Sequence, residues 1–298
     1  MTVRAMIGRL RRHARHPRAS MRLAWFRIYH QSRPPHTIRC KIGKNVLCLR
    51  SNSVLAPWLY SGRGFEEREC RFLHRIVRPR MTVLDIGANV GFYALQLARL
   101  VGPAGKVFCF EPYAPVAEYL EHNITANGLT NVTVVRKAVS DTTRPVNFNV
   151  FSDGHDVFNS LGVTEPPATS AMVERTIRVE TTTIDRFCAD HDLDRVNIMK
   201  IDVEGAEEKV IAGAADTLDR NHDVTILMET YEPMAMQCQC SSIRLMKSLL
   251  AAGFAIYSIS ELGSLVPIDP SEIPSLHKRK IVNVVFDRGN SPRSNSRV

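Results

Sequence analysis

Short apolar runs that alternate with helical segments constrain the fold of this chain more than any other feature. The first run is TVLDI at 82–86, and the second is KVFCF at 106–110. Between them, the apolar stretch from Phe92 to Val101 has the length of a helix and stops at Gly102-Pro103. A helix between two strands returns the chain to the starting edge, so that the strands pair in parallel. The pattern predicts an α/β protein with a doubly wound, mostly parallel sheet.

The alternation continues to residue 286. Further strands are predicted at VTVVRKAV (132–139), PVNFNV (145–150), TIRVETTT (176–183), VNIMKID (196–202), VTILME (224–229), FAIYSI (254–259) and IVNVVF (281–286). Helices are predicted where apolar residues share a face, at Val116, Leu120 and Ile124, at Val210, Ile211, Ala214 and Leu218, and around Ile243 to Ala252. The segment 152–173 is rich in Gly, Pro, Ser and Thr and is predicted to be a long loop. Loops of this length usually carry function or are disordered.

Charge is distributed unevenly along the chain. Residues 1–65 carry 14 Lys and Arg and no acid, whereas the other 233 residues carry 25 bases and 30 acids. We expect a basic arm over 1–33, lead-in strands and a helix over 34–80, one domain over 81–288, and a disordered tail over 289–298.

The arm combines arginines with bulky apolar residues between positions 21 and 29. This composition is typical of a segment that rests on an anionic membrane surface, so we expect peripheral membrane contact through residues 1–33. An acidic partner, an organellar targeting segment and a solvated extension remain open alternatives, and nucleic acid is the less favoured partner.

Two further observations exclude whole classes of protein. No stretch approaches the roughly 20 apolar residues of a membrane-spanning helix. The seven cysteines are odd in number and form no CxxC pair, which argues against a disulfide framework and against a four-ligand zinc site. We therefore expect a cytoplasmic chain that is associated with a membrane only at its periphery.

The turn after the first predicted strand reads Asp85-Ile86-Gly87-Ala88-Asn89-Val90-Gly91. It sits where a doubly wound sheet binds its ligand, between a strand end and a helix start. The dinucleotide fingerprint GxGxxG is absent because Asn89 replaces its middle glycine, and no P-loop motif is present. A carboxylate at Asp85 would repel a pyrophosphate but favour a ligand that bears an ammonium and a sulfonium. S-adenosylmethionine is such a ligand.

Polar residues also follow the next two strands. Glu111 ends the second strand 20 residues after Gly91, where an acidic side chain can accept hydrogen bonds from both hydroxyls of a ribose. Ser140 and Asp141 follow the third strand, at the place expected for the adenine edge. We predict that Asp85, Gly87, Asn89, Gly91, Glu111, Ser140 and Asp141 bind the cofactor.

Several motifs together resemble a known family. They are VLDIGANVGFYAL, FCFEP, EHNITANGL, TTTIDRF and MKIDVEGAEEKVIAG. In these motifs the chain is similar to the FkbM-type family of S-adenosylmethionine-dependent methyltransferases, over roughly three quarters of its length from about Gly64 onward, and KIDVEGAE is the most specific segment. The resemblance implies a class I methyltransferase (Rossmann-like) fold of seven strands with the last antiparallel. It also implies methylation of a hydroxyl on a sugar or natural product, and it supports the cofactor residues from Asp85 to Glu111.

Methyl transfer to a hydroxyl needs a base, or a metal ion that acidifies the hydroxyl. Alternation along the strand that ends in KIDVEG places Lys200, Asp202 and Glu204 on one side. We predict Asp202 as the general base, Glu204 as the second candidate and Lys200 as the charge partner, with Glu229 beside them. A base without a metal is favoured over a Mg²⁺ site. The alternative structural interpretation is that Lys200, Asp202 and Glu207 form ion pairs that hold the strand to its helix.

The acceptor is less constrained by the sequence. We expect the irregular segment with Asn159 and Ser160 to cover it and to contact a polyol, so that the acceptor is a small molecule or a lipid-linked glycan. The alternative function is a non-catalytic nucleotide-binding module that uses its basic arm on an anionic partner or membrane. An NAD-dependent enzyme is disfavoured by the missing glycine and by Asp85.

Overall fold

The structure is a computed structural model of the 298-residue chain, and it describes residues 17–62, 64–166, 171–276 and 281–288. The first 16 residues of the predicted arm and the whole of the predicted tail at 289–298 lie outside the described residues.

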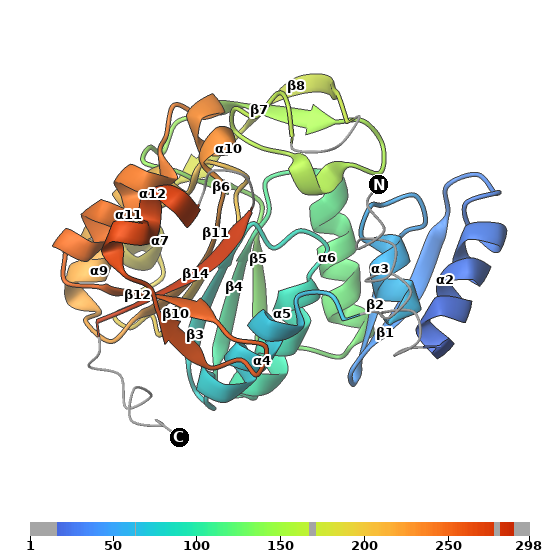
Figure 1. Ribbon diagram of the computed structural model, residues 1–298, viewed down its shortest axis with the longest axis horizontal. Helices are drawn as coiled ribbons and strands as arrows, with labels where there is room; N and C mark the ends of the chain where they lie inside the picture. The colour runs from blue at the N-terminus through green and yellow to red at the C-terminus, as the bar shows by residue number, and fades with distance from the viewer. Residues whose placement is uncertain (1–16, 63, 167–170, 277–280, 289–298) are drawn as a thin grey trace.

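A central sheet of eight strands organises the molecule (Figure 1). Its strands, in spatial order, are β13 (Leu265–Pro267), β12 (Ala255–Ile259), β14 (Val282–Asp287), β11 (Thr225–Thr230), β10 (Ile198–Ile201), β3 (Thr82–Ile86), β4 (Lys106–Phe110) and β5 (Val132–Val135). The strands from β5 to β11 pair in parallel, and β14 runs antiparallel to both β11 and β12. The doubly wound, class I methyltransferase sheet and its reversed last strand are therefore confirmed. The short edge strand β13 is an eighth strand that the sequence pattern did not predict.

Helices cover both faces of this sheet (Figure 1). One face carries α4 (Glu67–Ile76), α5 (Phe92–Val101) and α6 (Ala114–Ala126). The other carries α7 (Ile184–Asp190), α8 (Glu207–Ala212), α9 (Ala215–Arg220), α11 (Ser242–Ala251) and α12 (Ile273–Leu276). Alternation along β3 divides its side chains between the two apolar cores, because Val83 points to the first face and Leu84 and Ile86 to the second. Asp85 therefore shares the α4–α5 face with Val83.

Two predicted elements are each divided in the structure. The run 132–139 gives two strands, β5 and then β6 (Ala138–Val139). Between them, the backbone N–H of Lys137 donates a hydrogen bond to the Val135 carbonyl. The strand β6 lies outside the central sheet and pairs with β9 (Thr181–Thr182). The helix predicted around Val210 to Leu218 breaks into α8 and α9 at Gly213. A Cβ there would lie 2.2 Å from the Ser140 carbonyl oxygen, so the chain can pass this point only with glycine.

The segment before the sheet forms a layer of its own beside α6. It contains α2 (Pro17–Tyr29), the antiparallel pair β1 (Thr37–Ile42) and β2 (Asn45–Arg50), and α3 (Ala56–Ser61). Asn123 of α6 holds β2 in place through two hydrogen bonds. Its side chain accepts one from the Cys48 N–H and donates one to the Cys48 carbonyl. In α2, Phe26 is buried against Tyr60 of α3.

The long loop predicted at 152–173 contains more structure than expected. The strands β7 (Val146–Phe151) and β8 (Val173–Val179) form an antiparallel pair that flanks it, with a 3-10 turn, η1 (Asp156–Phe158), between them. A helix α10 (Glu232–Gln237) follows β11, and a second 3-10 turn, η2 (Pro270–Glu272), precedes α12. Within the described ranges, every helix is too short or too polar to cross a membrane.

Candidate active site

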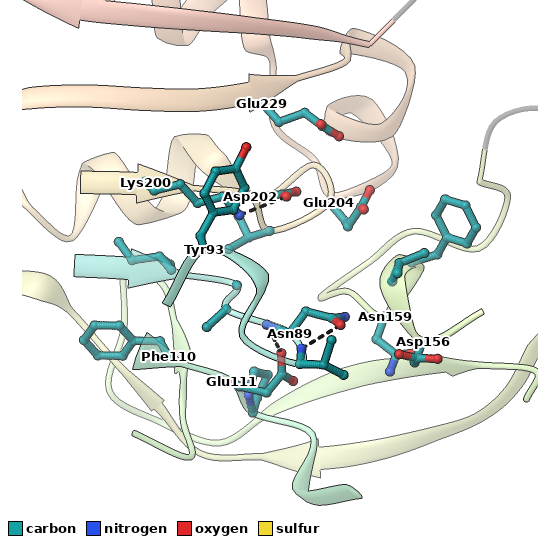
Figure 2. Close-up of a pocket in the computed structure, with 18 of the residues that line it drawn as sticks. Asn89, Tyr93, Phe110, Glu111, Asp156, Asn159, Lys200, Asp202, Glu204 and Glu229 are labelled. Carbon is teal, nitrogen blue, oxygen red and sulfur yellow. Dashed lines mark hydrogen bonds and ion pairs between the residues drawn. The ribbon is translucent and has the colours of Figure 1, made fainter. Parts of the chain in front are cut away.

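A cavity of about 250 Å³ opens at the carboxyl ends of β3, β4 and β10, where the sheet pattern places a ligand. In Figure 2, Lys200, Asp202, Glu204 and Glu229 stand on one side of this cavity and face Asn89 and Glu111 on the other. Its lining includes six carboxyl groups and two lysines, namely Glu66, Glu111, Asp156, Asp202, Glu204 and Glu229 with Lys137 and Lys200. The cavity therefore carries an excess of acidic groups.

The turn after β3 depends on residues that tolerate a left-handed backbone. Gly87 has φ of 81°, and a Cβ at this position would lie 1.8 Å from the carbonyl oxygen of Asp202. Asn89, which replaces the middle glycine of the dinucleotide fingerprint, has φ of 48°. Asparagine adopts this conformation more readily than most residues, so the turn keeps its shape without that glycine. Gly91, with φ of 96°, leads directly into α5.

Glu111 is held at the end of β4 by two backbone donors. Its Oε2 accepts a hydrogen bond of 3.1 Å from the Asn89 N–H, and its Oε1 accepts one of 2.9 Å from the Tyr113 N–H. Burial raises the pKa of Glu111 to about 7, although both hydrogen bonds oppose the shift. The carboxyl is thus fixed beside the turn, with acceptor capacity left for a ligand in the cavity.

Asp85 does not line the cavity; it is fully buried beneath it. The parallel register pairs Asp85 of β3 with Lys200 of β10, so both side chains point to the same face. Lys200 Nζ lies 4.0 Å from Asp85 Oδ1, and neither Asp85 carboxylate oxygen has a hydrogen-bond partner among the described residues. Burial raises the pKa of Asp85 to about 6. We therefore assign Asp85 to the support of Lys200, in place of the direct cofactor contact that we predicted from the sequence.

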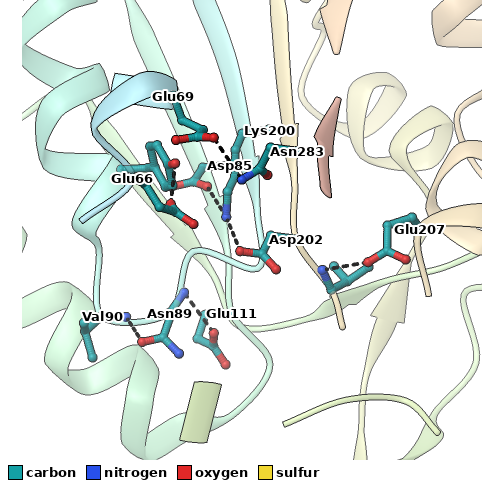
Figure 3. Close-up of polar contacts among 12 residues, drawn as sticks. Glu66, Glu69, Asp85, Asn89, Val90, Glu111, Lys200, Asp202, Glu207 and Asn283 are labelled. Carbon is teal, nitrogen blue, oxygen red and sulfur yellow. Dashed lines mark hydrogen bonds and ion pairs between the residues drawn. The ribbon is translucent and has the colours of Figure 1, made fainter. Parts of the chain in front are cut away.

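Lys200 and Asp202 form the central ion pair of the cavity, with Nζ 3.0 Å from Oδ2 (Figure 3). Burial alone would lower the pKa of Lys200, but Asp202, Asp85 and Glu66 outweigh it and raise that pKa. The Lys200 ammonium also lies 4.9 Å from the centre of the Tyr93 ring. A lysine in this environment stays charged and holds Asp202 in place.

Glu204 and Glu229 complete the acidic wall. One carboxylate oxygen from each of Asp202, Glu204 and Glu229 lies within 4.8 Å of the others. Burial, followed by the charge of Asp202, raises the pKa of Glu204 and of Glu229 well above the usual range. Glu204 reaches the cavity from a turn beyond the end of β10, with φ of 56°, instead of from the predicted extension of the strand. The three oxygens are close enough either to share protons or to hold a divalent cation.

Several residues of this site were not predicted from the sequence, Glu66 and Tyr93 among them. Glu66, just before α4, lines the cavity, and the Tyr93 hydroxyl of α5 donates a hydrogen bond to its Oε2. Burial, followed by the charge of Asp202, raises the pKa of Glu66 to about 7. Glu66 belongs to the acid-rich GFEE segment, in which no periodicity distinguishes it from its neighbour Glu67.

Positive φ values mark the same site. Six non-glycine residues of the described chain have positive φ, and three of them, Glu66, Asn89 and Glu204, line the cavity. Such conformations cost free energy and concentrate where side chains are held for function.

The remaining predicted residues are divided between the cavity and its surroundings. Asn159 lines the cavity, whereas Ser160 is buried and its Oγ accepts a hydrogen bond from the Val163 N–H. Neither Ser140 nor Asp141 is among the lining residues; the preceding segment Lys137 to Val139 lines the cavity instead. The predicted pair was displaced because the third strand ends early, at Val135.

The chemistry of this donor set fits S-adenosylmethionine. The Gly87–Gly91 turn lets the backbone approach a ligand closely, and Glu111 offers carboxylate oxygens suited to ribose hydroxyls. The excess of carboxyl groups suits a cationic sulfonium and disfavours a pyrophosphate.

Comparison with known proteins agrees with this geometry. The Methyltransferase FkbM domain model matches residues 85–256, more than half of the chain. The 2-O-methyltransferase NoeI of Sinorhizobium fredii is 28% identical over 151 residues, which are 48% of this chain and 61% of NoeI. The chain thus spans about three fifths of the length of NoeI. Methyltransferase sdnD of Sordaria araneosa is 25% identical over 191 residues, which are 54% of this chain and 70% of sdnD.

Two solved structures match a large part of the chain at low sequence identity. The SAM-dependent O-methyltransferase of Thermotoga maritima is 18% identical, with a TM-score of 0.40 over 86% of this chain and 78% of that one. Fibrillarin of Aeropyrum pernix, solved with natively bound S-adenosyl-L-methionine, is 13% identical, with a TM-score of 0.39 over 74% of each chain. The family model, the sheet order and the cavity lead to one conclusion: the chain belongs to the FkbM family of S-adenosylmethionine-dependent methyltransferases.

Proposed function

We propose that this methyltransferase transfers the methyl group to a hydroxyl and that Asp202 is the general base. The observation that carries the proposal is the position of Asp202, which lines the cavity on the wall opposite the Asn89 turn and is held there by Lys200. S-adenosylmethionine supplies an activated methyl group, so the protein needs chiefly to align the acceptor and remove its proton. A carboxylate fixed by an ion pair is suited to both tasks.

Glu204 and Glu229 have a different part in this proposal. Their raised pKa values favour protonated carboxyls, which can donate hydrogen bonds to acceptor oxygens. Glu204 is also the second candidate for the base. Because Lys200 already balances the charge of Asp202, we favour proton transfer to a carboxylate without a Mg²⁺ ion.

The donor-binding residues of the proposal are Gly87, Asn89, Gly91 and Glu111. Calorimetric melting of the protein with and without S-adenosylmethionine tests them. The donor should raise the melting temperature of the wild type, and Glu111→Ala or Gly87→Val should remove that increase. A Gly87→Val protein that melts like the wild type and still responds to the donor would contradict this assignment.

The acceptor class that we propose is a sugar hydroxyl, on a glycolipid or a related small molecule. Support comes from the name of NoeI as a 2-O-methyltransferase, and from the mixed wall of Asn159 and Asp156 with Phe158 and Leu161. Amide and carboxyl groups beside apolar side chains match the polar edges and the apolar faces of a sugar ring.

Methyl transfer from labelled donor tests the activity and the acceptor class together. A fractionated extract of the source cells is incubated with wild type or Asp202→Asn, and products are sorted into lipid, glycan and protein by extraction. The proposal expects label in an alkali-stable ether on a glycolipid or sugar, and none with the variant. Label in protein, or label transferred equally by both proteins, would contradict it.

We also propose that the chain makes peripheral contact with anionic membranes, with residues 1–33 as the contact arm, 34–80 as the lead-in and 81–288 as the methyltransferase domain. The support lies in α2, which is apolar on two opposite faces. Phe26 is buried, whereas Met21, Trp25 and Ile28 are 73%, 54% and 70% exposed. These three positions, four and three residues apart, share one stripe of the helix. Exposed Arg18, Arg22 and Arg27 flank that stripe, as in helices that lie in a membrane interface.

Vesicle sedimentation tests this contact. The full chain should bind phosphatidylglycerol vesicles at low salt and release them at high salt, with far weaker binding to phosphatidylcholine. Replacement of Met21, Trp25 and Ile28 by Ser should reduce binding, whereas replacement of three exposed apolar residues elsewhere, Met172, Met236 and Leu262, should not. Equal loss in both variants, or no loss in the first, would contradict a membrane role for α2.

A further inference from the structure

Glu66 is a cavity-lining carboxyl that lies outside the segment matched by the family model, which begins at residue 85. It precedes α4 in a left-handed conformation, with φ of 47° and ψ of 44°. Nothing about a helix start requires that conformation, and a bulky non-glycine residue adopts it at a cost in free energy. The backbone at this point therefore directs the Glu66 side chain into the cavity.

Within the part of the chain that the structure describes, one neighbour holds the Glu66 carboxyl. Among the described residues, only the Tyr93 hydroxyl is bonded to it, through Oε2. Tyr93 is itself buried in the first turn of α5, with its ring next to the Lys200 ammonium. The Glu66 carboxyl is thus oriented by Tyr93, and its other oxygen, Oε1, has no partner within the described part of the chain.

Glu66 and Glu111 lie on opposite sides of the Asn89 turn in Figure 3. Glu111 is the group suited to the ribose hydroxyls, so the region on the far side of the turn is left for the amino-acid end of the donor. That end carries an ammonium group. The sequence had assigned the recognition of this positive charge to Asp85, but Asp85 is buried next to Lys200 and does not reach the cavity.

We infer that Glu66 binds the ammonium group of S-adenosylmethionine. This inference rests on the donor and not on the proposed hydroxyl acceptor. Asp202 is less suited to the same task because Lys200 already neutralises it at 3.0 Å. Asp85 at the end of β3 does not reach the cavity, so Glu66 supplies the acidic group in its place. Glu66 lies some 20 residues earlier in the chain.

The raised pKa of Glu66, about 7, is consistent with this role in the free protein. Burial disfavours the charged carboxylate when no cation is bound, and an ammonium beside it reverses that preference. Binding of the donor near pH 6.5 should therefore release a proton from Glu66, which gives a readout that is independent of methyl transfer.

Isothermal titration calorimetry with three ligands tests the inference. S-adenosylmethionine and S-adenosylhomocysteine both carry the ammonium, whereas 5′-methylthioadenosine keeps the nucleoside and lacks the amino-acid end. Glu66→Gln still accepts the Tyr93 hydrogen bond but loses the charge. It should weaken binding of the first two ligands by at least about tenfold and leave binding of methylthioadenosine unchanged.

Glu67→Gln is the matched control, because Glu67 is exposed and pairs with Arg71 outside the cavity. A second variant, Glu66→Asn, tolerates the left-handed backbone and should give the same pattern if Gln at position 66 disturbs folding. In buffers of different ionisation enthalpy, the wild type should release more protons on donor binding than either variant of Glu66.

Each outcome bears on the inference. Equal weakening of all three ligands by both variants would mean that Glu66 only supports the fold, and unchanged binding of all three would mean that it serves the acceptor. Either result would overturn the inference. Failure of the wild type to bind any of the three would instead contradict the donor assignment itself, so the two failures are distinguishable.

Discussion

Lys200 and Asp85 face each other across the register of β10 and β3, with Nζ 4.0 Å from Oδ1 in a fully buried setting. This pair anchors the ammonium that holds Asp202 at the cavity wall, 3.0 Å away on the other side. A carboxylate at the end of the first parallel strand thus acts through the lysine of the neighbouring strand. The two strands that carry the donor turn and the predicted base are coupled by this one charge.

Replacement of Lys200 alone should therefore destabilise the protein more than replacement of both Lys200 and Asp85. Lys200→Met leaves Asp85 buried without a partner, which costs about 3–5 kcal/mol in comparable buried pairs. The double variant Lys200→Met/Asp85→Asn should recover most of that loss. Urea unfolding of the wild type, both single variants and the double variant measures the coupling. Additive losses would show that the two residues act separately.

Asp202→Asn should abolish most of the activity without unfolding the protein, because Asp202 is partly exposed and its amide can still face Lys200. Loss of a general base lowers kcat by about 10²–10⁴-fold. S-adenosylmethionine should bind the variant with nearly unchanged affinity. Glu208→Gln, which removes the partner of the exposed Arg244 outside the cavity, is the control and should keep full kcat. A kcat of Asp202→Asn within a few-fold of the wild type would transfer the role to Glu204.

Chelation should have little effect on methyl transfer. Asp202, Glu204 and Glu229 are close enough for a cation, but the Lys200 ammonium occupies Asp202 and burial favours the protonated forms of the other two. Activity after dialysis against EDTA should stay within about twofold of the starting value, and added Mg²⁺ should not raise it. Loss of activity on chelation, with recovery on Mg²⁺ alone, would establish the metal site in place of the metal-free base.

The free protein should lose stability as the pH rises from 5 to 8. Burial raises the pKa of Glu207 from 4.5 to about 7, and that of Glu111 to the same value. Between pH 4.5 and 7 the folded state keeps protons that the unfolded state releases, so the stability present at low pH is lost as the pH passes 7. Each group accounts for a loss on the order of 3 kcal/mol in the free energy of unfolding over this pH range.

Glu207→Gln isolates one of these contributions, because Glu207 accepts from the Val203 and Gly205 N–H groups and does not line the cavity. Urea unfolding at pH 5 and pH 8 should show a smaller difference in this variant than in the wild type. An equal difference in both proteins would place the ionisation elsewhere.

The sequence predicted the parts of this fold that follow from local patterns. Helix and strand periods located β3, α5 and β4, because their apolar residues recur at clear spacing. The edge strand β13 was missed, since its three residues, two of them exposed, carry no such signal. The break at Val135 was not predicted because apolar residues resume at Ala138 after Arg136 and Lys137, and only tertiary pairing with β9 directs Ala138 out of the sheet.

The sequence also predicted those residues of the site that follow from the positions of strand ends. Glu111, Lys200, Asp202, Glu204 and Glu229 all reach the cavity, because each follows or ends a parallel strand at one edge of the sheet. The burial of Asp85 beneath the cavity could not be derived from its position at a strand end, since it depends on the pairing with Lys200 of the neighbouring strand. The location of Glu66 depends on a left-handed backbone at a helix start, which no residue type in that segment requires.

A crystal structure with S-adenosylhomocysteine tests the donor site and the position of Asp202 together. We expect the ligand in the cavity between Gly87 and Glu111, with both ribose hydroxyls bonded to the Glu111 carboxylate and the departing sulfur facing Asp202. Electron density for the ligand in any other cavity, or a ribose that does not contact Glu111, would contradict the assignment of this cavity to the donor.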